Sequence, residues 1–417
     1  MSKVYVMGGA QTDFERNWSR EGKNVIAMLR EVLADGCADA KITYNEITKL
    51  NEENRVSCFV GSYLSELYNN QSHVGALLTE VHPAFVGVPA VRVESAGASG
   101  AAAIDAAVTK IAAGETDVAI VVGWALVNSV DAATGASYVS RAAYMEKESI
   151  GVDAIMPYQI DQMVGKYLAR YDAPQDRVMK SLAHIAELGY EGGKRNNKAQ
   201  TRKLYMCEEQ ANMRGCATNP MIGEYLAQSD ANMVTTDGAA VVVLCSEEYK
   251  KAHFADTMMP IVKGRGVRVA PMVFNTRMED AANSDCMMPW TKKAVDEAYA
   301  KAGMTVDDID VFELHDYFTM TEYLLLSCVG VAEAGKEYEA IESGKIEFNG
   351  EKPVNPTGGF IGGGNPQAAG GVRMFLDIAR QTAGKAGKGQ VKGAKNGLMV
   401  NFGGIATTNY AFIVGQE

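Results

Sequence analysis

The residues that could do chemistry lie in a few short blocks, and the first block has a glycine where a reactive side chain is expected. Residues 93–105, VESAGASGAAAID, are typical of a strand that turns sharply into a helix of small residues. Such a turn exposes one residue at its tip, and the N–H groups there and at the helix start attract negative charge. The tip residue is Gly97, which has no side chain that could act as a nucleophile. The turn can therefore bind and polarise a substrate without attacking it.

Ser95 and Ser99 flank this tip, one at the strand end and one in the first helical turn. A serine near a helix start usually caps the helix. We therefore interpret both hydroxyls as structural and keep a nucleophilic role as the alternative. The seven cysteines form no CxxC pair and no zinc-ligand spacing, so we expect no metal site in this chain.

Polar residues in the later blocks indicate hydrogen-bond and proton-transfer chemistry. His315 follows the apolar run 311–314, so it should reach the carboxyl edge of a sheet, where sites form in α/β proteins. Its ordinary pKa of about 6.5 suits proton transfer near neutral pH; the alternative is a structural histidine. Asn365 and Asn401 carry amides, which can donate to an oxyanion but cannot shuttle a proton. Asp316, the strand neighbour of His315, should point the opposite way and orient a backbone group or loop.

The elements that must position these residues form two similar series. Apolar, β-branched runs at 117–126 and 238–246 predict central strands that are covered on both faces. Strands alternate with helical stretches in residues 1–250, and a similar order returns in 251–417, which predicts an α/β protein of two similar halves. The segment at about 127–230 breaks the pattern, being richer in Tyr, Met, Asn and charge. We expect it to be an inserted loop domain that covers the site.

The inserted segment contains a run of cations near its middle. Their functional interpretation is contact with the phosphates of a cofactor, and the alternative is a solvated loop. These cations are Lys194, Arg195, Lys198, Arg202 and Lys203.

Composition excludes several classes of protein. The formal net charge of −11 argues against a general nucleic-acid-binding role. No apolar run reaches the roughly 18 residues that span a bilayer, and the first residues lack the pattern of a signal peptide. We interpret the cysteines as reduced thiols and expect a cytoplasmic protein that binds neither nucleic acid nor membrane.

Taken together, the blocks resemble those of the thiolase superfamily, most closely its sterol-carrier-protein-type branch. The resemblance covers essentially the whole chain. In this family a cysteine normally stands at the position of Gly97, a histidine at that of Asn365, and often a Cys-x-Gly where this chain has Asn401, Phe402 and Gly403. The matching blocks are VYVMGGAQTDF, VESAGASGAAAI, ELHDYF, NPTGGFIGGGNPQAAGGVR and VNFGGIATTN.

The resemblance implies a thiolase fold, in which two similar βαβαβ halves stack as α-β-α-β-α layers, and a homodimer. It implies that the substrate is an acyl-CoA, with coenzyme A as the thioester carrier. The N–H groups of Gly97 and Gly403 would hold the thioester oxygen as an enolate develops. Family members without the cysteine run retro-aldol cleavage with a small zinc-ribbon and OB-fold partner, and a related two-subunit branch includes benzoylsuccinyl-CoA thiolase.

The resulting hypothesis is an enzyme that makes or breaks a carbon–carbon bond beside a CoA thioester without a cysteine acyl-enzyme. Retro-aldol and retro-Claisen reactions both remain open, because they share the enolate fragment. Its catalytic candidates are His315, Asn365, Gly97, Gly403 and Asn401. The alternatives are a non-catalytic subunit that serves a partner as scaffold or acyl-CoA holder, and a module that binds free CoA.

Overall fold

Nine strands form one mixed sheet in the computed structural model, which describes residues 3–149, 151, 154–232 and 234–417. The order across the sheet is β3-β2-β4-β5-β1-β6-β9-β8-β7. The strands are β1 (Val4–Gln11), β2 (Val56–Ser62), β3 (Ala90–Val93), β4 (Val118–Ala125), β5 (Gly238–Ser246), β6 (Ile261–Val269), β7 (Val311–Leu314), β8 (Asn396–Gly403) and β9 (Thr408–Gly415).

The sheet consists of two half-sheets with the same pairing pattern. In the first, β5 is antiparallel to β1 and β4, and β2 is parallel to β4. In the second, β9 is antiparallel to β6 and β8, and β7 is parallel to β8. The halves meet where β1 pairs with β6 at Tyr5 and Ile261. Every residue of β4 and β5 is buried, as their apolar, β-branched sequences predict.

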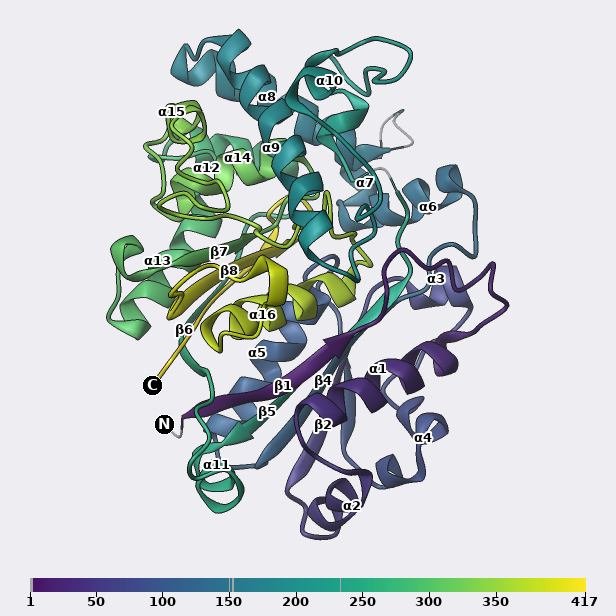
Figure 1. Ribbon diagram of the computed structural model, residues 1–417. Helices are drawn as coiled ribbons and strands as arrows, with labels where there is room; N and C mark the ends of the chain where they lie inside the picture. The colour runs from purple at the N-terminus through teal and green to yellow at the C-terminus, as the bar shows by residue number, and fades with distance from the viewer. Residues whose placement is uncertain (1–2, 150, 152–153, 233) are drawn as a thin grey trace.

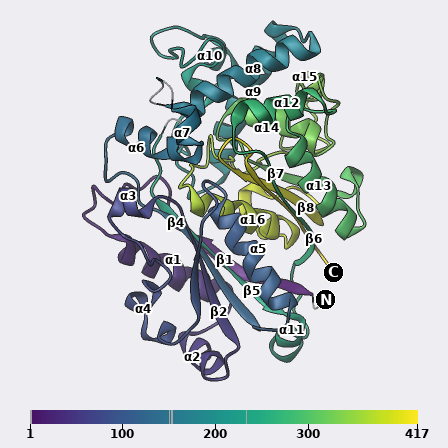
Figure 2. The same cartoon turned by 180° about the vertical axis from the view of Figure 1, so that it is seen from behind.

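Helices stack on both faces of the half-sheets and between them, which gives the predicted α-β-α-β-α layers (Figure 1). Helix α1 covers the outer face of the first half, and α13 covers that of the second. Figure 2 shows α5 and α16 between the half-sheets from behind. The helices are α1 (Val25–Asp39), α2 (Tyr44–Glu52), α3 (Ser65–Asn69), α4 (Leu78–Val81), α5 (Ser99–Ala112), α6 (Ala132–Val139), α7 (Met145–Glu148), α8 (Ile155–Tyr171), α9 (Gln175–Arg195), α10 (Glu208–Asn212), α11 (Glu247–His253), α12 (Phe274–Ala282), α13 (Pro289–Ala302), α14 (Thr319–Cys328), α15 (Glu337–Glu342) and α16 (Ala368–Thr382).

Small residues allow the two central helices to pack closely. A Cβ at Gly100 would overlap the Ala368 carbonyl oxygen, and one at Gly371 would lie 2.8 Å from the Ala101 nitrogen. Helix α16 also contacts strands of both half-sheets. The core between the layers therefore depends on glycine and alanine at the α5–α16 crossing.

The segment 127–230 is more helical than the loop domain that its composition predicts. It contains α6, α7, α8, α9 and α10, and α9 continues to Arg195, into the predicted cationic loop. The amphipathic face of α9 buries Val178, Leu182 and Ile185 in the core of the second half. This apolar periodicity is visible in the sequence, but the many polar residues between its members conceal it.

Among the described residues, no helix is both long enough and apolar enough to cross a bilayer.

Candidate active site

Side-chain hydrogen bonds stabilise the turn between β3 and α5. Ala96 has a φ of +49°, a left-handed conformation that is strained for alanine. The Ser99 hydroxyl donates to the Ala96 carbonyl at 2.6 Å and accepts from the Ser95 N–H at 2.9 Å. The Ser95 hydroxyl bonds the Thr408 hydroxyl at 2.8 Å. Both serines thus stabilise the turn, as their interpretation as structural residues predicts.

The backbone conformation at the tip does not require residue 97 to be a glycine. Its φ is outside the left-handed region. A Cβ there would meet the Phe402 carbonyl oxygen at 3.6 Å and His315 Cε1 at 3.9 Å, both ordinary contacts. The missing side chain therefore leaves open space beside the histidine ring.

A cavity of about 520 Å³ lies at this tip. Gly97, His315 and Asn365 line it together, so the structure brings three of the predicted site residues to one place. Most of the wall is apolar or aromatic, and it includes Val139, Met156, Ile160, Ile222, Phe318 and Ile405. A cavity of this size and lining is typical of a small-molecule site.

His315 is 6% exposed and its ring is fixed by its neighbours. It stacks on Phe402 with 3.8 Å between ring centroids and meets Phe360 edge-on at 4.8 Å. The Phe402 N–H donates to Nδ1 at 3.3 Å, and the Asn401 side-chain amide donates to the same atom at 2.9 Å. Because a backbone N–H can only donate, Nδ1 accepts and the ring hydrogen is on Nε2.

Burial also changes the charge expected for this histidine. Desolvation, together with the positive charge of Arg373, lowers the pKa of His315 to about 3. The ordinary pKa used in the sequence interpretation is therefore wrong for this site. The ring is neutral at physiological pH and presents Nε2–H as a hydrogen-bond donor.

The other predicted residues occupy different positions around this ring. Asn401 is fully buried behind the ring and is absent from the cavity wall, so its amide orients His315. The amide of Asn365 lies on the wall, while its backbone N–H donates to Thr236 at 3.1 Å. Gly403 packs against the Ser95 carbonyl, and its neighbours Phe402 and Gly404 line the cavity.

Asp316 orients the Gly-rich turn, as its position in the sequence predicts. Its carboxylate accepts the N–H of Phe360 at 2.6 Å and that of Ile361 at 3.1 Å. Burial raises the pKa of Asp316 to about 6. Arg373, also buried, donates to Glu313 at 2.8 Å and places positive charge in the same layer. These groups hold the turn and the strand that carries His315.

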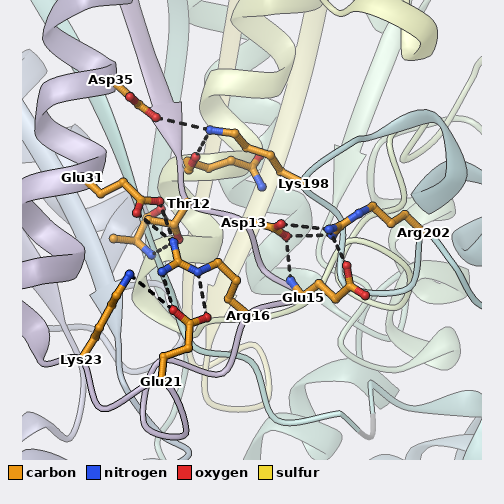
Figure 3. A network of polar contacts seen from close by, with 12 residues as sticks. Thr12, Asp13, Glu15, Arg16, Glu21, Lys23, Glu31, Asp35, Lys198 and Arg202 are labelled. Atoms are coloured by element: carbon orange, nitrogen blue, oxygen red, sulfur yellow. Dashed lines mark hydrogen bonds and ion pairs between the residues drawn. The ribbon is translucent and has the colours of Figure 1, made fainter.

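Two of the predicted phosphate-binding cations are engaged with the N-terminal segment (Figure 3). Lys198 donates to the Gln11 carbonyl at 2.6 Å and lies 3.6 Å from Asp35. Arg202 holds both carboxylate oxygens of Asp13, at 2.7 and 2.8 Å. These pairings between distant parts of the sequence fix the segment 196–203 to the first half.

The remaining cations also lie outside the cavity wall. Lys203 pairs with Glu15 at 2.9 Å. Lys194 lies over the Tyr205 ring at 4.7 Å, and burial lowers the pKa of Arg195. Their contact with CoA phosphates stays a prediction, since a phosphate would have to compete with the partners these cations already have.

Sequence reasoning missed Gln367, which lies on the cavity wall at the start of α16. It has a φ of +43°, unusual for glutamine, and its Oε1 is buried with no hydrogen-bond partner among the described residues. Strained backbone and unsatisfied polar atoms concentrate at functional sites. Its position two residues after Asn365, in the Gly-rich block, is the sequence feature that could have identified it as a site residue.

One group of described side chains is close enough to share a metal ion: His184, Glu187 and Glu208. The His184 Nδ1 atom lies 3.1 Å from Glu187 and 3.2 Å from Glu208. None of the three lines the cavity. The chemistry at Gly97 therefore does not use them, and the expected absence of a metal stays a prediction.

Replacing each of the two glycines of the predicted oxyanion hole with alanine should change the stability of the protein by different amounts. Gly403→Ala is expected to lower the free energy of unfolding by about 1–3 kcal/mol, because its Cβ would overlap the Ser95 carbonyl oxygen. Gly97→Ala should change stability much less, since its Cβ meets only ordinary contacts. Urea denaturation of the two variants measures this difference, and equal losses would contradict the packing described here.

Two family models match most of the chain. Residues 4–200 match the thiolase N-terminal domain, and residues 274–416 match the thiolase C-terminal domain-like family. The chain belongs to the thiolase family. This confirms the resemblance seen in the sequence blocks and the predicted thiolase fold.

Individual thiolase relatives are distant in sequence but match along the whole chain. An acetyl-CoA acetyltransferase of Methanothermobacter thermautotrophicus is 27% identical over 408 residues, covering 98% of both chains. Sterol carrier protein 2 of Oryctolagus cuniculus is 25% identical, covering 97% of this chain and 70% of that protein. A solved structure described as an Ltp2-ChsH2(DUF35) aldolase superimposes with a TM-score of 0.77 at 18% identity, covering 100% of this chain and 98% of that one. At that identity the superposition shows the thiolase fold alone.

Proposed function

We propose that this thiolase-family chain binds an acyl-CoA and makes or breaks the carbon–carbon bond beside its thioester without a covalent acyl-enzyme. The observation that carries the proposal is Gly97 at the tip of an otherwise intact turn, beside His315 and open to the cavity. None of the seven cysteines is among the described residues that line this cavity. A thiol nucleophile is therefore missing from the place where the substrate would bind.

The donors around the tip suit an enolate intermediate. In the cleavage direction, the electrons of the breaking carbon–carbon bond move onto the thioester carbonyl oxygen. The β-carbon fragment leaves as a carbonyl compound in a retro-aldol reaction, and its hydroxyl proton goes to water in the cavity. The Nε2–H of His315, with the N–H groups of Gly97 and Gly403 and the Asn365 amide, would stabilise the negative oxygen. The enolate then takes a proton at carbon and leaves as a shorter acyl-CoA.

Intact mass spectrometry tests the absence of a covalent intermediate. After incubation with acyl-CoA, the chain is expected to keep its unmodified mass while turnover proceeds with its partner and substrate supplied. The measurement uses Cys216→Ala as the background, because hydrogen bonding to Thr218 lowers the pKa of the Cys216 thiol and favours non-specific acylation. An acyl adduct on Ser95, on Ser99 or on a remaining cysteine would overturn the proposal. Full binding without any turnover would favour the acyl-CoA holder instead.

We further propose that the cations of segment 194–203 contribute to CoA binding. Replacing all five with alanine is expected to weaken CoA affinity, each exposed cation contributing up to about 1 kcal/mol. Isothermal titration calorimetry with CoA measures the change. A matched variant with Lys250 and Lys251 on α11 replaced should bind normally, because these lysines lie on a different element. Unchanged affinity in the five-alanine variant would remove this segment from the CoA site.

The proposed assembly is a homodimer with a small zinc-ribbon and OB-fold partner. Strand β3 lies at the edge of the sheet, and its Val91 is 48% exposed, which leaves an unpaired edge for a second copy. The name of the solved Ltp2-ChsH2(DUF35) aldolase contains two components, which supports a partner subunit. Light scattering of the chain, alone and with such a partner, measures both associations. The proposed location remains the cytoplasm.

A further inference from the structure

A short chain of hydrogen bonds leads away from Asn365, the cavity amide that the proposed function uses as an oxyanion donor. The backbone N–H of Asn365 donates to the Thr236 hydroxyl oxygen at 3.1 Å. The Thr236 hydroxyl in turn donates to Gln200 Oε1 at 2.8 Å, and the Val234 carbonyl oxygen lies 3.1 Å from it as a second acceptor. A hydroxyl can accept from one group while it donates to another, so Thr236 connects Asn365 with Gln200.

The Thr236 side chain is a buried member of this chain of bonds. It is 1% exposed, although the residue forms part of the cavity wall. Its one hydrogen and one of its lone pairs are already used within the protein. A hydroxyl with these commitments orients its neighbours rather than a substrate.

The turn that carries Asn365 has little freedom once its N–H is held. Gly364 has a φ of +100°, a conformation that glycine adopts readily, and a Cβ there would lie 3.1 Å from both Gln200 and Thr236. The two side chains therefore close over the turn at this glycine. Pro366 follows Asn365 and disfavours a helical backbone there. These contacts together fix the direction in which the Asn365 side chain leaves the turn.

Gln200 gives this chain of bonds a rigid support. Its backbone N–H donates to the Gly363 carbonyl at 3.0 Å, and its side-chain amide donates to the Thr235 carbonyl at 3.2 Å. Lys198 and Arg202, two residues away on each side, are bonded to the N-terminal segment (Figure 3). The support therefore extends from the first half of the protein to the Gly-rich turn.

We propose that Thr236 is a positioning residue for the Asn365 amide and that Gln200 supports it. By fixing the Asn365 backbone, the two side chains hold the amide at the place where the thioester oxygen becomes negative. A donor that is already oriented needs no reorganisation when the charge develops, whereas a small displacement from the required geometry weakens it. The inference rests on the proposed function, in which Asn365 is one of the donors.

Two matched thioether analogues of an acyl-CoA test this role without requiring turnover or a partner subunit. Carboxymethyl-CoA places a negative oxygen near the position where the enolate oxygen would form, and carbamoylmethyl-CoA has the same shape without the charge. Isothermal titration calorimetry gives the affinity of the chain for each analogue. The ratio of the two affinities measures how well the donors around Gly97 stabilise a negative oxygen, because the contribution of the CoA moiety cancels.

The wild type is expected to bind carboxymethyl-CoA more tightly than carbamoylmethyl-CoA. Asn365→Ala should lower this preference by about tenfold, the usual effect of losing one hydrogen bond to a charged group. Thr236→Val keeps the shape of the side chain but removes the hydroxyl, so it should lower the preference by about fivefold and leave the affinity for carbamoylmethyl-CoA unchanged. Thr236→Ser keeps the hydroxyl and should keep the preference.

A double variant separates positioning from a general structural effect. Because Thr236 acts through Asn365, Thr236→Val should lower the preference no further when it is combined with Asn365→Ala. An equal loss with and without the Asn365 amide would mean that Thr236 affects the cavity by another route, and would overturn the inference.

Thr116→Val provides the matched control. Thr116 is also buried, at 4% exposure, and its hydroxyl also donates within the protein, to the carbonyls of Arg55 and Val118, but the residue does not line the cavity. This variant should keep the preference, and thermal denaturation shows whether each variant is folded. If Thr236→Val does not fold, Gln200→Met should lower the preference instead, because it removes the acceptor of the Thr236 hydroxyl at a half-buried position.

The remaining outcomes distinguish the inference from the proposed function. If the wild type prefers carboxymethyl-CoA and folded Thr236→Val keeps the full preference, Thr236 does not position Asn365, and the proposed function is untouched. If the wild type shows no preference, or binds neither analogue, the proposed oxyanion site itself fails, and the inference fails with it.

Discussion

Replacing His315 with alanine is expected to lower turnover by about 100- to 1000-fold, the usual effect of removing one oxyanion donor. The ring is neutral, carries its hydrogen on Nε2 and lies beside the open space at Gly97. Its loss removes a donor from the place where negative charge develops. Steady-state turnover with saturating acyl-CoA measures the change, which should appear in kcat more than in KM, because the donor acts mainly on the transition state.

Several controls separate this role from a structural one. His253→Ala, on α11 outside the cavity, should leave turnover unchanged. Asn401→Ala should cause a smaller loss than His315→Ala, because the Phe402 N–H still bonds Nδ1. The pH profile should show no inflection near 6.5 from His315, since its pKa is lowered to about 3 and the ring stays neutral across the usual assay range. Activity indifferent to His315→Ala would favour the non-catalytic subunit.

The variant Gly97→Cys is expected to convert the chain into one that forms a covalent acyl adduct. The new Cβ fits at ordinary contact distances from Phe402 and His315. The start of α5 favours the thiolate and should lower the pKa of the new thiol. Intact mass spectrometry after incubation with acetyl-CoA should show one acetyl group per chain, and peptide mapping should place it at position 97.

The matched variants for this experiment are Gly97→Ala and Gly97→Ser. Alanine tests whether occupying the space alone disturbs the site. Serine offers a weaker nucleophile, because the neighbouring His315, whose pKa is lowered to about 3, is a weak base. Neither variant should be acylated. Failure of Gly97→Cys to react, in a folded protein that still binds CoA, would mean that the turn no longer presents its tip residue to a thioester.

The fold was predictable from sequence because its signals are local and agree with one another. The buried runs 117–126 and 238–246 became β4 and β5, with bounds within about two residues. The turn at Gly97 and the strand before His315 are also local patterns, so both could be placed at the carboxyl edge of strands. The helical content of 127–230 was underestimated, since its apolar face in α9 is interrupted by polar residues.

The parts of the site that escaped prediction depend on contacts between distant segments. The tautomer and lowered pKa of His315 follow from Phe402 and from burial between layers, neither of which its own block shows. The pairing of Arg202 with Asp13 joins residues that lie far apart in the chain.

The placement of α16 limits how independently the two halves can fold. The half-sheets pair at Tyr5 and Ile261, while α16 from the second half packs on α5 and on strands of the first. A fragment that ends near residue 250 would expose the apolar face that α16 covers, including Val121 and Val242. The two halves resemble each other, but neither is expected to fold on its own. Separately produced halves should need each other in order to become native, as two fragments of one cooperative unit.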